Sequence, residues 1–84
     1  MTGNDIPPAL RFDPHALNRM AGRRITAVEV AEALGDRETT YPSRRRPGRL
    51  VVLGCTWAGR RLKIVIEAAD ERFVWTVADR DEEN

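Results

Sequence analysis

The 84 residues are 42% hydrophobic and 32% charged, enough apolar content for one small domain with a single core. The one cysteine, Cys55, excludes an internal disulfide, and no Cys/His cluster has the spacing of a metal site. We therefore expect no metal and no other cofactor, and a cytoplasmic location. No segment approaches the roughly 18 apolar residues of a membrane span, and the polar residues 1–8 do not look like a cleaved secretion signal.

The net charge of +1 conceals a strong asymmetry along the chain. Residues 44–63 contain seven basic residues and no acidic one, whereas residues 79–84 contain four acidic residues and one arginine. A local basic patch attracts polyanions because the nearby field, and not the total charge, governs encounter. We predict a loose lead-in over residues 1–11, a single domain over residues 12–78 and an acidic tail over residues 79–84.

The first predicted element is a helix over residues 14–21. Asp13 is a good N-cap residue, and Gly22 suits the left-handed residue that ends a helix. The apolar side of this helix is expected to face a core. His15 and Arg19, four residues apart, are then neighbours on its polar rim.

A second helix is predicted to follow directly and to end at Gly35. Thr26 and Glu29 have the spacing of a capping box, which marks its start. Val28, Ala31 and Leu34 recur every three residues and predict the stripe that faces the core, which Val30 and Ala27 widen.

The rest of the chain has the alternation and turn signals of strands. Strands are predicted over residues 36–41, 49–57, 61–67 and 73–78, with an exposed arginine-rich loop over residues 43–48. The fold expected is α+β in the order ααββββ, with both helices packed on one face of a three- to four-stranded antiparallel sheet.

Within these strands, Arg61 and Lys63 alternate with apolar residues and point to the face opposite them. Thr76 is a polar residue on the last strand. Trp57 and Trp75 are expected in the core, and stacking on a nucleic-acid base is the alternative for one of them.

The hairpin motif His15-Ala-Leu-Asn-Arg-Met-Ala-Gly-Arg-Arg-Ile25, together with strands at 62–66 and 73–77, resembles a bacterial domain family of formally unknown function. Members of that family have the fold of the RelE/ParE toxin superfamily. The likeness covers residues 12–78 and extends more loosely to BrnT-type toxins.

The resemblance implies a small toxin of a toxin–antitoxin pair that cleaves RNA without a metal, as mRNA interferases do. Such cleavage uses the RNA 2′-hydroxyl as nucleophile and needs an acid or base and cations for the phosphorane charge. His15 fits the acid or base because histidine exchanges a proton near neutral pH, and Arg19 fits the phosphate. Thr76 is a possible hydroxyl contributor. The predicted nucleic-acid-binding residues are Arg23, Arg44, Arg45, Arg46, Arg49, Arg61 and Lys63.

Two alternatives stay open at this point. Arg19 and Arg23 can instead pair with Glu29, Glu32 or the acidic tail. The chain can also be a non-enzymatic RelE/ParE-fold interaction module, since ParE-like relatives act on a protein target and RelE toxins have a C-terminal tyrosine that this chain lacks. In that case the edge strand near residues 39–41, or the last strand, is expected to pair with an antitoxin segment or with a second copy.

Overall fold

The computed structural model describes residues 9–82, so residues 1–8 of the expected lead-in and the last two residues of the acidic tail lie outside the described residues. The elements in chain order are β1 (Arg11–Phe12), α1 (Pro14–Arg23), α2 (Ala27–Gly35), β2 (Arg37–Pro42), β3 (Arg49–Cys55), β4 (Arg61–Glu67), β5 (Asp70–Asp79) and the short 3₁₀ turn η2 (Arg80–Glu82). The sheet therefore extends one residue beyond each expected limit of the domain. No described helix has the length and apolar character needed to cross a membrane.

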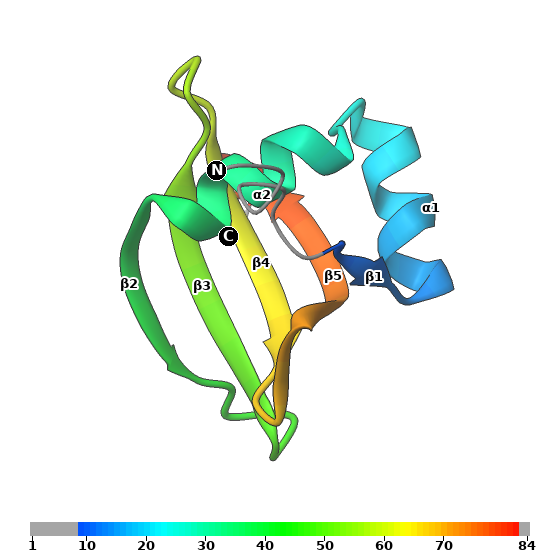
Figure 1. The fold of residues 1–84 in the computed structure, drawn as a ribbon, viewed down its shortest axis with the longest axis vertical. Coiled ribbons are helices and arrows are strands. Elements are labelled where there is room, and N and C mark those ends of the chain that lie inside the picture. Colours follow the sequence, from blue (N-terminus) through cyan, green and yellow to red (C-terminus); the bar gives the residue numbers. More distant parts are fainter. Residues whose placement is uncertain (1–8, 83–84) are drawn as a thin grey trace, which may run out of the picture.

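The strands form one five-stranded sheet in the order β1-β5-β4-β3-β2 (Figure 1). The α+β class and the order of helices before the antiparallel strands are confirmed. The expected count of three to four strands is wrong, and so is the all-antiparallel sheet, because β1 pairs in parallel with β5 through Arg11 and Phe73. Two residues are too short to show alternation, so the sequence did not reveal β1.

Both helices supply the core on one side of the sheet. Helix α2 packs on β3 and β4, whereas α1 runs beside β5 and β1 at one edge, opposite the β2 edge (Figure 1). The buried residues that join the helices to the sheet are Ala16, Met20, Ile25, Val30, Ala33, Val52, Leu62, Ile64, Ile66, Val74 and Val77. Because α1 lies near the edge, its polar rim borders the other face of the sheet.

Helix α1 is longer than predicted, and the residue that ends it is different. Gly22 lies inside the helix, and the left-handed residue is Arg24, with φ of 55°. The backbone N–H of Arg24 donates to the carbonyls of Ala21 and Met20, which closes the last turn. The predicted capping box of α2 is confirmed: Glu29 N–H donates to Thr26 Oγ1, and Thr26 N–H donates to Glu29 Oε1 at 2.9 Å.

The apolar stripe predicted for α2 faces the core only in part. Val30 is buried and Leu34 packs against the core, as predicted, whereas Val28 is 65% exposed and Ala31 is exposed. Ala33, which the predicted stripe did not include, is buried because α2 closely approaches β3: a Cβ atom at Gly54 would overlap the carbonyl oxygen of Ala33. This contact sets the rotation of α2. Val28 and Ala31 instead border an apolar groove of about 470 Å³.

A β-bulge in β5 changes which side chains share a face. Val65 pairs with Thr76 and Ile66 pairs with Val74, so Trp75 is the extra residue between them. Val74 and Val77 are both buried in the core, which a regular alternation does not allow. A regular alternation along the strand predicted over residues 73–78 would have placed Trp75 with Val77 and Val74 with Thr76, and the bulge prevents this.

Candidate functional site

A cavity of about 510 Å³ opens on the face of the sheet away from α2. Its walls come from α1, the loop before β3, and strands β3, β4 and β5. We call it the basic hollow, and its lining residues are His15, Arg19, Ser43, Arg45, Arg46, Arg49, Val51, Lys63, Val65, Trp75, Thr76 and Ala78. These include four arginines, one lysine and one histidine but no carboxylate. Such a surface attracts anions.

The α1 wall presents His15 and Arg19, one helical turn apart. The Asp13 side chain accepts a hydrogen bond from the His15 backbone N–H at 2.9 Å and fixes the start of the helix. Ala16 and Met20 are buried, which anchors the opposite side of the helix and turns His15 and Arg19 toward the hollow. The predicted rim is confirmed in this respect.

Arg19 is half-buried, and its Nε atom is buried. No described residue accepts a hydrogen bond from this atom. A buried donor without an acceptor costs free energy, so an anion that enters the hollow and reaches this N–H would offset that cost.

The floor of the hollow is apolar. Val51 and Ala78 are buried and Val65 is half-buried, and all three belong to the face opposite the core. Lys63 pairs with Ala78 across β4 and β5, which places its side chain above this floor. The β5 bulge brings the consecutive residues Trp75 and Thr76 to the hollow together.

Hydrogen bonds within the arginine-rich loop fix its shape at the mouth of the hollow. The Ser43 hydroxyl accepts from the Arg46 N–H at 3.2 Å, and the Ser43 N–H donates to the Arg49 carbonyl at 2.9 Å. Gly48, with φ of 86°, makes the turn into β3. Within the described part of the chain, no carboxylate forms an ion pair with Arg45, Arg46 or Arg49.

Arg49 stacks on Trp75, with its Cζ atom 3.8 Å from the ring centroid. The indole is itself held in place: its Nε1–H donates to Glu67 Oε1 at 3.2 Å, and Phe73 contacts it edge-on at a centroid distance of 4.8 Å. One side of the hollow is therefore a cation supported by an aromatic ring.

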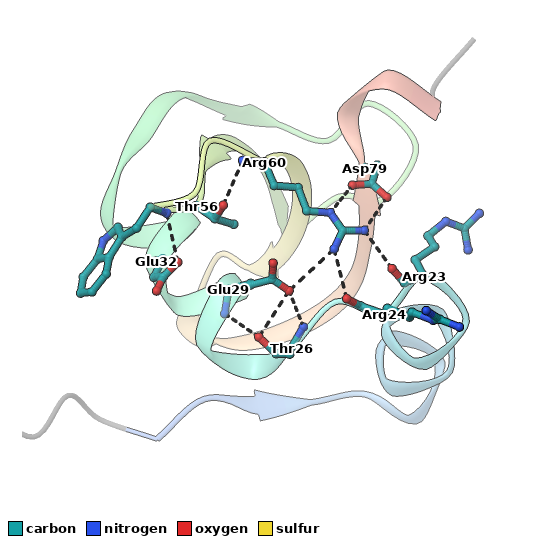
Figure 2. Close-up of polar contacts among 9 residues, drawn as sticks. Arg23, Arg24, Thr26, Glu29, Glu32, Thr56, Arg60 and Asp79 are labelled. Carbon is teal, nitrogen blue, oxygen red and sulfur yellow. Dashed lines mark hydrogen bonds and ion pairs between the residues drawn. The ribbon is translucent and has the colours of Figure 1, made fainter.

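Arg60, outside the hollow, holds α1 in position (Figure 2). Its Nε and Nη2 atoms donate to the two carboxylate oxygens of Asp79 at 2.7 and 2.9 Å. Its Nη2 and Nη1 atoms also donate to the carbonyls of Arg23 and Arg24 at 2.8 and 3.1 Å. These four hydrogen bonds, which we call the Arg60 clamp, join the last turn of α1 to the end of β5. Both elements are walls of the hollow. The hydrogen bond from Arg60 lowers the pKa of Asp79 below its ordinary value.

The structure brings most of the predicted site residues together. His15, Arg19, Arg45, Arg46, Arg49, Lys63 and Thr76 line the basic hollow, whereas Arg23, Arg44 and Arg61 do not. Arg23 ends α1 next to the Arg60 clamp, and Arg44 is exposed on the loop. Arg61 lies at the start of β4, close enough to Glu38 to help Arg80 lower the pKa of that carboxyl.

The alternative partners weighed for Arg19 have other bonds. Glu29 caps α2 and forms an ion pair with Arg60 at 3.7 Å, and Glu32 accepts the Trp57 backbone N–H at 3.0 Å. Neither carboxylate pairs with Arg19, so among the described residues its guanidinium stays open to a ligand.

Both tryptophans were expected in the core, and five residues that line the hollow were not predicted for the site: Ser43, Val51, Val65, Trp75 and Ala78. No role was predicted for Ser43, although a serine whose hydroxyl accepts the backbone N–H three residues later is typical of a turn. Trp75 was expected in the core and instead lines the hollow, because the bulge has no clear sequence signature. Trp57 is 85% exposed at the turn between β3 and β4, so its expected burial is wrong.

Within residues 9–82, no group of three or more His, Cys, Asp or Glu side chains is placed to hold a metal ion. No family model matches the chain, no curated protein is significantly similar to its sequence, and no solved structure significantly matches its fold. The chemistry of the site is therefore argued from its own side chains.

Proposed function

We propose that the protein binds RNA in the basic hollow and cleaves it without a metal, as a toxin-like ribonuclease would. The observation that supports this most directly is the convergence of His15, Arg19 and Lys63 on one cavity with no carboxylate in its lining. A phosphodiester needs cations around its charge and a proton acceptor beside its nucleophile.

The roles follow from the chemistry of the side chains. The His15 imidazole accepts the proton of the RNA 2′-hydroxyl, whose oxygen attacks the adjacent phosphorus. The P–O5′ bond breaks, leaving a 2′,3′-cyclic phosphate, and the departing oxygen takes a proton from solvent. Arg19 and Lys63 stabilise the charge that builds on the phosphorane oxygens, and Thr76 donates a hydroxyl hydrogen bond.

The test is cleavage of a defined RNA by the purified protein in the presence of EDTA. His15→Ala is expected to lower the rate by roughly 10²- to 10⁴-fold, and Arg19→Ala to lower it and weaken binding. Asn18→Ala is the matched control, because Asn18 is an exposed α1 residue that does not line the hollow. A 2′-deoxy substitution at the cleaved position must block the reaction.

The same variants should be expressed inducibly in a bacterium, with growth and transcript integrity measured. If the folded wild-type protein cleaves no RNA and leaves growth unchanged, or if His15→Ala is as active as wild type, the ribonuclease proposal fails.

A second candidate function is that of a non-enzymatic interaction module, and the exposed edge strand β2 favours it. All six residues of Arg37–Pro42 are exposed, and β2 pairs only with β3. An unpaired strand edge can accept a strand from an antitoxin segment or a second copy. Strand β5, the other edge considered from the sequence, lies between β1 and β4. A co-purifying partner, together with unchanged biological effect in His15→Ala, would favour this function over the enzyme.

A further inference from the structure

The stacked pair Arg49 and Trp75 gives the basic hollow a feature that phosphate binding alone does not require. A phosphate is bound through the N–H edge of a guanidinium or by the point charge of a lysine, and neither contact needs an aromatic ring beneath the cation. Here the guanidinium carbon of Arg49 lies over the indole ring of Trp75, 3.8 Å from its centroid, and within the described residues no side chain accepts a hydrogen bond from this guanidinium.

The indole cannot easily move out from under Arg49. It belongs to the β5 bulge, its Nε1–H is bonded to Glu67, and Phe73 contacts it edge-on. Glu67 is also the cross-strand neighbour of Arg49, yet its carboxylate bonds to Trp75 and to the Ala69 N–H instead. The stacked pair of Arg49 and Trp75, which we call the platform, is therefore formed before any ligand binds.

A flat cation on an aromatic ring is a surface on which a nucleobase can stack. Unpaired bases stack on aromatic side chains and on arginine planes, and each such contact contributes about 1 to 3 kcal/mol. In a duplex, both faces of nearly every base are already covered by neighbouring bases, so no base face is free to stack on Arg49.

We propose that Arg49 on Trp75 is a nucleobase-stacking subsite that makes the basic hollow select unpaired RNA over paired RNA. The inference rests on the proposed RNA-binding function and adds the substrate class to it. The phosphates on either side of the stacked nucleotide lie against the remaining cations, with Arg45 and Arg46 on one wall and Arg19 on the other.

The experiment compares three probes whose bases are unpaired, paired or absent. They are a 2′-O-methyl RNA strand of about ten nucleotides, which lacks the nucleophile and is not cleaved, its duplex, and an abasic strand with the same number of phosphates. Binding is measured by fluorescence anisotropy at one salt concentration. The wild-type protein is expected to bind the intact strand roughly 5- to 100-fold more tightly than the abasic strand, and to prefer it to the duplex.

The variant Arg49→Lys keeps the positive charge but removes the planar surface. We expect it to bring the ratio of intact to abasic affinity close to one. Arg45→Lys is the matched control, because Arg45 lines the same hollow but does not lie over an aromatic ring of the described residues. This variant should keep the wild-type ratio. Circular dichroism and thermal melting confirm that both variants are folded.

The outcomes separate this inference from the ribonuclease proposal. Equal binding of intact and abasic strands by the wild-type protein, or an unchanged ratio in Arg49→Lys, overturns the stacking subsite even if RNA is cleaved. A retained base preference without any cleavage supports the subsite and overturns the catalytic step alone. Failure to bind any of the three probes overturns both.

Discussion

Arg60 and Asp79 are joined by two hydrogen bonds, at 2.7 and 2.9 Å, and the same guanidinium also binds the last carbonyls of α1 (Figure 2). The pair is partly shielded, with 29% and 24% of the two side chains exposed. One arginine therefore links α1, β5 and the turn before β4. The position of the α1 wall of the basic hollow depends on this contact.

Asp79→Asn is expected to lower the free energy of unfolding at neutral pH by about 1 to 3 kcal/mol, because it removes a charged acceptor from Arg60. Urea denaturation measures the change. Asp81→Asn is the control, since Asp81 is exposed and forms no hydrogen bond or ion pair with the described residues. It should leave the free energy of unfolding nearly unchanged.

The same pair predicts how stability depends on pH in acid. The folded protein holds the pKa of Asp79 below its ordinary value, chiefly through the Arg60 hydrogen bond, so the unfolded chain binds a proton first as pH falls. The contribution of Asp79 is complete above the unfolded pKa of about 3.9 and is lost as pH drops through the lowered folded value. Wild type should lose stability more steeply than Asp79→Asn below about pH 4. Parallel pH profiles would contradict this assignment.

Gly54→Ala should be strongly destabilising, because its Cβ would overlap the backbone carbonyl of Ala33 and force α2 away from β3. Overpacking of this kind costs about 1 to 3 kcal/mol or more. Gly22→Ala is the matched control: it lies within α1 with no atom near the added Cβ, so it should stabilise the protein by about 0.5 to 1 kcal/mol. Thermal unfolding of the two variants compares the effects. Equal melting temperatures would show that the contact between α2 and β3 is not tight.

Arg24→Gly should stabilise the protein by about 0.5 to 1 kcal/mol, because residue 24 adopts a left-handed conformation that costs an arginine free energy and a glycine little. Among the described residues, the Arg24 side chain forms no hydrogen bond or ion pair whose loss would offset this gain in stability. Ala21→Gly, in the preceding turn of α1, should destabilise by about 1 kcal/mol. Denaturant midpoints of both variants test the sign, and a loss of stability in Arg24→Gly would count against the assigned end of α1.

RNA binding should show which arginines of the loop contact phosphate. Arg46 lines the basic hollow and Arg44 does not, although the two are of the same type and only two residues apart. Arg46→Ala should reduce the slope of log affinity against log salt by about 0.7, the value for one lost phosphate contact on a single strand. Arg44→Ala should leave the slope unchanged. Titrations at several salt concentrations measure both, and equal slopes in the two variants would mean that the loop acts only as diffuse charge.

The sequence by itself determined what depends on neighbours along the chain. The capping box of Thr26 and Glu29 begins α2 as predicted, and the strand predicted over residues 61–67 is the observed β4. The polar rim of His15 and Arg19 follows from helical periodicity, and the basic segment follows from composition. Each of these signals acts over a few residues, so one chain is enough to reveal it.

Only the tertiary structure decided the features that depend on contacts between distant segments. Arg24 rather than Gly22 is the left-handed residue that caps α1, and its carbonyl accepts a hydrogen bond from Arg60, 36 residues away. The approach of Ala33 to Gly54 fixed the rotation of α2, which buries Val30 and Ala33 and leaves Val28 exposed.

The basic hollow also depends on contacts between distant segments. Its walls combine α1, a loop and three strands, and the β5 bulge turns Trp75 toward the cavity where Arg49 stacks on it. Local charge could not distinguish Arg44 from Arg45, because their positions depend on how the loop folds against the sheet. The sequence therefore predicted which residue types a site could use, and packing between distant elements selected which of them meet.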